Sequence, residues 1–494
     1  MSFEFNNSEQ NNSNVDNNNN NINKVSSNSI NHNLNNNNNN IDNSEQLFSQ
    51  KINNIIFQLQ ESFKNYEGEN RANSFQKLLN NQDLILILTE LSKKNLEEIV
   101  VYILNEFTIS TSSENETKEK LFTDLFLLSI KKGQIHILEQ LDKLDINFSQ
   151  IVDNEGNSGL ILAVIYSKIQ IAKFFLKRCP EMLDMKNNLG YTPLLLSVYN
   201  NDNLMFFLLA NNLDNVITDG NSLCELAIRN ENLDILNYLN PEINKKKCNY
   251  IPSQLLLHFA SCQTSLEIFN TVVKMVKKYD YQIQSSLETP LHWAVMKANY
   301  HIVKALVTLY KENQIDIDQK NAFGVTPFFL SNLRQDKYIC ELLFENGADV
   351  NEQDNEGNSI VHLISALGDV KWLKYMIKKF NVNCYLKNEK GDTPFIQAIL
   401  SENYKCVEFF IELFKSSKGT NSMNLNWRNK YGQTPLHAAV FTDNISIIEL
   451  LLKNKADISI CDLNDLTPYH YAYIEEKEEI IQTIHKILGV NFIK

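Results

Sequence analysis

The chain has 494 residues, and 59 acidic against 46 basic residues give it a formal net charge of −13. This balance argues against a general affinity for nucleic acid or for anionic membranes, both of which favour a basic surface. No apolar run approaches the roughly 18 residues of a membrane-spanning helix, and no N-terminal apolar segment resembles a signal peptide. The sequence therefore predicts a soluble, cytoplasmic protein without membrane insertion, with the nucleus left open.

The eight cysteines are scattered along the chain and include no C-x-x-C pair. Cys340 and Cys406 lie inside apolar stretches with helical spacing, which indicates small buried side chains rather than disulfides. The sequence thus predicts a reducing compartment, no metal site and no cofactor.

Residues 1–43 are dominated by asparagine, which fills 21 of the 43 positions. A segment with so few apolar side chains cannot offset the entropy lost on ordering, so we expect disorder there. Asn-rich tracts can also form β-type assemblies, which leaves a role in assembly as the alternative to a tolerated tail.

Residues 44–123 change to a helical pattern, with Ile52, Ile56 and Leu59 at helical spacing. We expect an N-terminal helical region that contains a degenerate capping repeat near residues 84–107. If Asp124 occupies the position of the threonine in the anchor described in the next paragraph, a repeat array starts at residue 124. We expect this array to extend to residue 473 and a capping helix to occupy residues 474–494.

A six-residue anchor organises the array, and its clearest copy is Thr434-Pro435-Leu436-His437-Ala438-Ala439. The threonine hydroxyl can cap a helix N-terminus, and proline suits the first helical position because its missing N–H has no partner there. The apolar face of a second helix follows a polar break and comprises Ile447, Ile448, Leu451 and Leu452. The segment therefore predicts a helix-turn-helix hairpin with one buried side.

Copies of this anchor recur in phase. Its threonines are Thr192, Thr289, Thr326, Thr393, Thr434 and Thr467. Its histidines include His258, His292, His362, His437 and His470. Weaker copies start at Ser158, Ser222, Leu255 and Ser359. From Ser158 to Thr467 the steps between copies are 34, 30, 33, 34, 37, 33, 34, 41 and 33 residues.

This pattern resembles the ankyrin repeat, with its T-P-L-H-x-A signature and a period of about 33 residues. The resemblance covers roughly residues 84–494. It implies an all-α solenoid of about eleven or twelve helix-turn-helix repeats with short β-hairpin loops, stacked into a curved, elongated body. It also implies that the anchor histidines tie neighbouring loops together by hydrogen bonds instead of binding metal.

The repeat loops share one further feature, and two stretches depart from the regular pattern. The loops carry a glycine just before the anchor, as at Gly220 and Gly391, where a tight turn favours positive φ. Residues 239–254 are irregular and precede an anchor without Thr-Pro, so we expect a weak joint there. Residues 415–422 form an insertion in the 41-residue step and should be a mobile loop.

Because the outward loops are free of packing constraints, their residues should determine the choice of partner. The candidates for partner binding are Lys320, Phe323, Tyr385, Lys387, Trp427, Arg428 and Tyr431. Trp427, Arg428 and Tyr431 form the preferred cluster, since such side chains are frequent at interface hot spots. The alternative is that Trp427 packs under its own loop.

One loop also resembles a modification site. Leu343, Asp349, Val350 and Asn351 match the spacing around asparagines that a cytosolic hydroxylase modifies in some ankyrin repeats. Asn351 is therefore a possible hydroxylation site; the alternative is an ordinary structural asparagine.

The chain contains no phosphate-binding or nucleophile-elbow motif and no H-E-x-x-H metal motif. The tail and the repeats also leave no stretch for a catalytic domain. We therefore expect a monomeric, non-enzymatic scaffold or adaptor that binds a protein partner on the concave face of the array. The alternative is a substrate-receptor subunit of a larger enzyme such as a ubiquitin ligase, for which residues 44–110 would have to hold the docking module.

Overall fold

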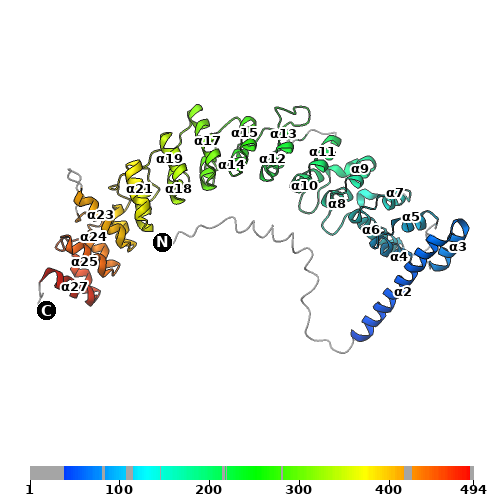
Figure 1. The fold of residues 1–494 in the computed structure, drawn as a ribbon, viewed down its shortest axis with the longest axis horizontal. Coiled ribbons are helices and arrows are strands. Elements are labelled where there is room, and N and C mark those ends of the chain that lie inside the picture. The colour runs from blue at the N-terminus through cyan, green and yellow to red at the C-terminus, as the bar shows by residue number, and fades with distance from the viewer. Residues whose placement is uncertain are drawn as a thin grey trace. The chain divides into compact units, whose positions relative to one another are not determined.

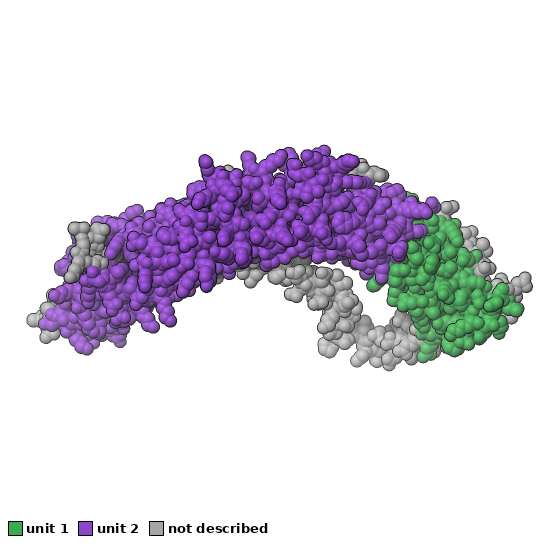
Figure 2. All heavy atoms as spheres, turned by 45° about the horizontal axis from the view of Figure 1, so that its top comes forward, with its two compact units in different colours: residues 1–153 green, residues 154–494 purple. Residues whose placement is uncertain are grey.

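The computed structural model describes residues 38–79, 84–106, 115–144, 146–213, 217, 220–279, 282–416 and 425–489. The chain divides into two compact units, Met1–Asp153 and Asn154–Lys494 (Figure 2). Most of the expected disordered tail, residues 1–37, lies outside the described residues, whereas residues 38–43 belong to the first helix. Residues 417–422 of the expected mobile insertion also lie outside them, and residues 415–416 end a helix.

Unit 1 consists of helices. They are α2 (Asn38–Asn65), α3 (Gly68–Leu78), α4 (Leu84–Lys93), α5 (Glu97–Glu106), α6 (Asn115–Lys132), α7 (Ile135–Asp142) and the short 3-10 helix η1 (Phe148–Gln150). Helix α4 packs on α6, and α5 packs on α7, so the unit contains two consecutive helix pairs. Asp124 lies inside α6 and does not start a helix, because the apolar pattern continues unbroken on both sides of it.

Unit 2 is a row of ten helix pairs in chain order, from α8 to α27, within the part of the chain that the structure describes (Figure 1). The first helices of the pairs are α8 (Gly159–Ile165), α10 (Pro193–Tyr199), α12 (Gly220–Arg229), α14 (Leu255–Ser261), α16 (Pro290–Met296), α18 (Pro327–Leu333), α20 (Ile360–Leu367), α22 (Pro394–Leu400), α24 (Pro435–Phe441) and α26 (Pro468–Ile474). The second helices are α9 (Ile169–Arg178), α11 (Asn203–Asn212), α13 (Leu233–Leu239), α15 (Leu266–Met275), α17 (Tyr300–Glu312), α19 (Lys337–Glu345), α21 (Val370–Phe380), α23 (Tyr404–Ser416), α25 (Ile445–Lys453) and α27 (Glu478–Leu488). The 3-10 helix η2 (Pro180–Asp184) follows α9.

The anchor residues begin the first helices by capping them. Thr434 is the N-cap of α24 and its hydroxyl accepts a hydrogen bond from the His437 backbone N–H, while Pro435 occupies the first turn. Thr192, Thr289, Thr326 and Thr467 cap their helices in the same way. Thr393 is the exception, because its hydroxyl is buried and has no hydrogen-bond partner among the described residues.

The core of unit 2 lies between successive pairs. Except at the step from α18 to α20, first helices pack on first helices along the row, and each second helix packs on its own first helix. Ile447, Ile448 and Leu451 of α25 are fully buried, as their helical spacing predicts. Each such side chain stabilises the fold by about 1.5–3 kcal/mol through burial. The all-α fold expected from the sequence is therefore confirmed.

The loops between pairs are tight turns. Among the described residues they include the isolated bridges of Gln353 with Ser359 and of Ile217 with Cys248, and no extended strand. The expected β-hairpins are thus reduced to turns. Side-chain amide and carboxylate oxygens accept hydrogen bonds from loop N–H groups that would otherwise bond to a neighbouring strand.

The irregular stretch 239–254 is held by Tyr250. Its hydroxyl donates a hydrogen bond to the Leu239 carbonyl oxygen at 2.5 Å and lies 3.0 Å from the Cys224 sulfur. Its ring covers Gly220, where an added Cβ would lie 2.0 Å from the ring. Gly220 is the first residue of α12, two residues before Ser222, and it lacks the positive φ expected before an anchor.

Candidate interaction surface

The loop turns are built around one side chain that replaces backbone pairing. In the loop before α24, the Asn429 side-chain oxygen accepts hydrogen bonds from the Tyr431 and Gln433 backbone N–H groups, at 3.0 and 2.9 Å. The corresponding residues of other loops are Asn187, Asn321, Asp354, Asn388 and Asp462. Such side-chain turns fix the loop tips in the same conformation from repeat to repeat.

Backbone hydrogen bonds join these tips into what we call the loop-tip ladder. In each rung, an N–H of one loop donates to a carbonyl oxygen of the preceding loop, at 2.8–3.1 Å. The rungs are Ala322 to Ser286, Asn355 to Phe323, Glu389 to Glu356, Lys430 to Lys390, and Leu463 to Tyr431. The tips of consecutive repeats therefore form one continuous edge from residue 286 to residue 463.

The anchor histidines form a second row of links beneath the tips. The Thr289 backbone N–H donates to Nδ1 of His292 at 3.1 Å, so Nδ1 is the acceptor and Nε2 carries the proton. Nε2 then donates to the Val325 carbonyl oxygen in the next loop at 3.0 Å. His258, His362 and His437 reach Glu288, Asp392 and Leu466 in the same way. His470, in the last pair, is exposed.

Burial keeps these imidazoles neutral. It lowers the pKa of His258, His292 and His362 from the usual value to about 4, and it also lowers the pKa of His437. The histidines are separated by whole repeats and do not converge on one point, so their geometry is that of a structural ladder.

Trp427 is covered by its neighbours. The Lys387 ammonium lies 4.0 Å from the centre of its ring, a cation–π contact. The indole N–H is buried and has no hydrogen-bond partner among the described residues. Lys387 thus covers part of the ring, and part of the tryptophan surface serves to pack the loop.

Arg428 and Tyr431 have different environments. The Arg428 guanidinium donates to the Gly432 carbonyl oxygen at 3.0 Å and to the Cys461 carbonyl oxygen at 2.9 Å. Arg428 thus clamps its own loop to the next one. Tyr431 stands at a loop tip and is 55% exposed, so its ring is open to a partner.

The other candidates lie on the preceding loops. Phe323 is 73% exposed at its tip. Lys320 forms an ion pair with Glu352 at 2.7 Å and donates to the Gln353 carbonyl oxygen. Tyr385 is half-buried. The structure therefore places all seven candidates on the loop side of unit 2, with Phe323 and Tyr431 the most accessible apolar surfaces among them.

Asn351 takes part in a further link between loops. Its side-chain oxygen accepts a hydrogen bond from the Asn383 backbone N–H at 2.7 Å, and its own N–H donates to Asp349. Asp318 and Asn426 accept from Asp349 and Asp457 of their following loops in the same way. Asn351 is thus one member of a structural series.

The sequence reasoning did not select the tip residues that precede the loop glycines or the equivalent Asp465. These are Glu356, Glu389, Lys390, Lys430 and Leu463, and all are exposed. Their position one or two residues before a loop glycine, or before the equivalent Asp465, was the signal that could have identified them.

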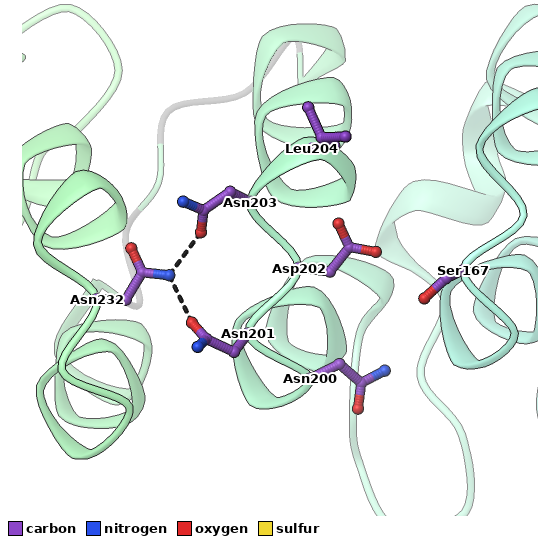
Figure 3. A pocket seen from close by; sticks show the side chains of 7 residues that line it. All are labelled: Ser167, Asn200, Asn201, Asp202, Asn203, Leu204 and Asn232. Carbon is purple, nitrogen blue, oxygen red and sulfur yellow. Dashed lines mark hydrogen bonds between the residues drawn. The ribbon is translucent and has the colours of Figure 1, made fainter.

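A polar hollow of about 540 Å³ lies at the opposite ends of the helices, where the turns within successive pairs meet (Figure 3). The Asn232 amide group stands between Asn201 and Asn203 and donates to both side-chain oxygens at 2.5 Å. Asn232 and Asp202 also cap α13 and α11. These polar groups are engaged in holding the turns, which gives the hollow a structural role.

The described residues also bear on two other kinds of feature, a metal site and a membrane-spanning helix. No group of three or more His, Cys, Asp or Glu residues there is placed to hold a metal ion. No helix there is both long and apolar enough to cross a membrane. Cys340 and Cys406 are buried, which raises the pKa of their thiols to about 12 and about 11.

Comparison with known families agrees with this geometry. Models of ankyrin repeats match residues 223–321, 328–422 and 418–472. The chain belongs to the ankyrin repeat proteins.

Among known proteins, the chain is similar to the NAD-dependent deacetylase sir2B of Dictyostelium discoideum, with 23% identity over 46% of this chain and 30% of that protein. It is 25% identical to the putative ankyrin repeat protein L371 of Acanthamoeba polyphaga mimivirus, over 57% of this chain and 38% of that protein. It is 24% identical to human inversin over 41% of this chain and 18% of that protein. The matched regions thus span well under half of these relatives.

Solved structures of ankyrin repeat domains also match. The domain of Bcl-3 covers 41% of this chain and 86% of its own, at 22% identity and a TM-score of 0.35. The domain of human ASB11 covers 47% of this chain and 96% of its own, at 21% identity and a TM-score of 0.37.

Proposed function

We propose that this chain is a non-enzymatic scaffold or adaptor that binds a partner protein on the concave face of its repeat array. The repeats make it an interaction protein, and the loop-tip ladder is the surface that can meet a partner. The observation that supports this most is the exposure of Phe323 and Tyr431 on loops that are otherwise rigidly hydrogen-bonded. Rigid loops lose little entropy on binding, and aromatic side chains contribute strongly at interfaces.

The proposal also covers the compartment, the oligomeric state and the partners of the chain. We take it to act as a cytoplasmic monomer with protein partners, without cofactor and without nucleic acid or membrane insertion. The similarity to a deacetylase covers only 30% of that enzyme, and it does not assign its chemistry to this chain.

The alternative is a substrate-receptor subunit of a larger enzyme complex such as a ubiquitin ligase. Its docking module would have to lie in residues 44–110. Helices α2 and α3 precede the first repeat-like pair, α4 and α5, and provide the only extra helical surface among the described residues of that range. Recovery of ligase subunits that depends on α2 and α3 would favour this alternative.

Affinity purification of the full chain from its native cytosol tests the proposal. The informative variant is Phe323→Ala with Tyr431→Ala, which removes two exposed tip rings. The matched control is Tyr338→Ala, because Tyr338 is 76% exposed but lies on the second helix α19. We expect a reproducible partner that the control retains and the loop variant loses. Absence of any reproducible partner would contradict the proposed function.

A further inference from the structure

Three consecutive rungs of the loop-tip ladder pair residues of like chemistry. Glu356 and Glu389 share one rung, Lys390 and Lys430 share the next, and Tyr431 and Leu463 share the one after that. Each rung is a direct backbone hydrogen bond, at 2.9, 3.0 and 3.0 Å, so the two tips of a rung are immediate neighbours. Three consecutive rungs of the edge therefore carry acidic, basic and apolar side chains in that order.

These pairings do not serve the fold. Like charges on directly neighbouring backbone positions repel and destabilise. Lys390 and Lys430 form no ion pair among the described residues, and both are exposed. Leu463 is 70% exposed beside Tyr431, so the apolar rung is also left open to solvent. A ligand with the opposite charges and an apolar group would complement these exposed side chains.

The basic rung is held in position. Gly391 lies beneath Lys430, where an added Cβ would come within 2.8 Å of the Lys430 backbone nitrogen and 3.2 Å of its Cγ. The Lys430 side chain thus runs over a residue without a side chain, and Arg428 fixes the same loop to Cys461. The two lysines are consequently presented by a rigid surface.

We propose that this edge binds an extended segment of the partner that carries a basic, an acidic and an apolar residue in that order, about three residues apart. The spacing follows from geometry. Successive rungs lie one repeat apart, about 8–10 Å for packed helices. An extended chain advances about 3.3 Å per residue, so three residues span one rung. This inference rests on the proposed function and specifies the chemistry of its partner.

The same pattern disfavours a ligand of uniform charge. A polyanion would meet Glu356 and Glu389 beside the lysines, and a basic segment would meet Lys390 and Lys430. Only a segment with alternating charges satisfies both rungs, which makes a protein segment the appropriate occupant.

Panning a phage library of random linear peptides on the full chain tests this inference without knowledge of the partner. We expect enriched peptides to carry an acidic residue three positions from an apolar one, with a basic residue three positions to the other side. A selected peptide is then measured by fluorescence anisotropy. The double variant Lys390→Glu/Lys430→Glu should weaken it about tenfold, as expected for loss and reversal of two exposed charge pairs.

Two controls make the result specific. The variant Lys304→Glu/Lys371→Glu changes the net charge equally, but at exposed lysines on α17 and α21, and should leave the affinity unchanged. Exchanging the acidic residue of the peptide for lysine should restore binding to Lys390→Glu/Lys430→Glu. Enriched peptides without this charge order, equal affinity for both double variants, or no enriched peptide would overturn the inference. A partner recovered from cytosol would still leave the scaffold function standing in those cases.

Discussion

Nε2 of His437 lies 3.0 Å from the carbonyl oxygen of Leu466, which belongs to the loop of the next repeat. Each such bond crosses from one helix pair to the following loop, so the buried imidazoles connect neighbouring repeats directly. Stability therefore depends on these histidines remaining neutral.

This dependence predicts acid lability. The pKa of His258, His292 and His362 is about 4 in the folded chain and about 6.5 in the unfolded chain. The unfolded state therefore binds more protons between these values, and the free energy of unfolding should fall as the pH falls from about 6.5 to about 4. Urea titrations across this range should show the decrease. The variant His292→Gln/His362→Gln should show a shallower slope; an unchanged slope would contradict the prediction.

Gly391 should not tolerate a side chain. Its φ is +80°, and an added Cβ would lie 2.8 Å from the Lys430 nitrogen. Gly391→Ala should lower the free energy of unfolding by about 2–3 kcal/mol, since the left-handed conformation alone costs about 1–2 kcal/mol. Gly347→Ala is the control, because Gly347 has a φ of +97° with no atom near its Cβ position. Equal losses for both variants would show that the contact with the next loop contributes nothing.

Tyr250 should decide whether the irregular stretch 239–254 behaves as a weak joint. All three tryptophans, Trp293, Trp372 and Trp427, lie after it, so their fluorescence reports only that side, whereas circular dichroism reports all helices. Because Tyr250 holds this stretch in the parent chain, we expect both signals to change together on heating; separate transitions there would show the weak joint that the sequence predicts. Tyr250→Ala should separate them, because it removes a ring packed on Gly220 and costs about 3 kcal/mol or more. Coincident transitions in this variant would contradict the assignment.

Asn351 remains a proposed hydroxylation site. We expect mass spectrometry of native protein to find one added oxygen on the peptide that contains Asn351. The peptide containing Asn426, whose side chain accepts a comparable hydrogen bond from Asp457, should be unmodified. An unmodified Asn351 would leave it as a structural residue, bonded to Asn383.

The repeat register was predictable because its signals are local. Thr434 and Pro435 begin a helix through their own capping and backbone preferences. The helical spacing of Ile447 and Ile448 likewise indicates the buried face without reference to any other repeat. The same reasoning failed at Asp124, where a helix continues through the expected start.

Contacts between repeats were less accessible to prediction. Lys390 and Lys430 are neighbours only because two loops separated by an insertion stack in register. Tyr250 belongs to a stretch without the anchor motif, so nothing in the pattern pointed to its place over Gly220. Arg428 looked like a contact residue by type, and its bonds to Gly432 and Cys461 became visible only with the loops in place.

The most direct test of the central claim is hydrogen–deuterium exchange of the full chain with and without the partner recovered from cytosol. The proposed function predicts new protection in the loop segments 320–325, 385–391 and 427–433, with the outer second helices unchanged. Protection confined to α19, α21 and α23, or to residues before 154, would contradict it.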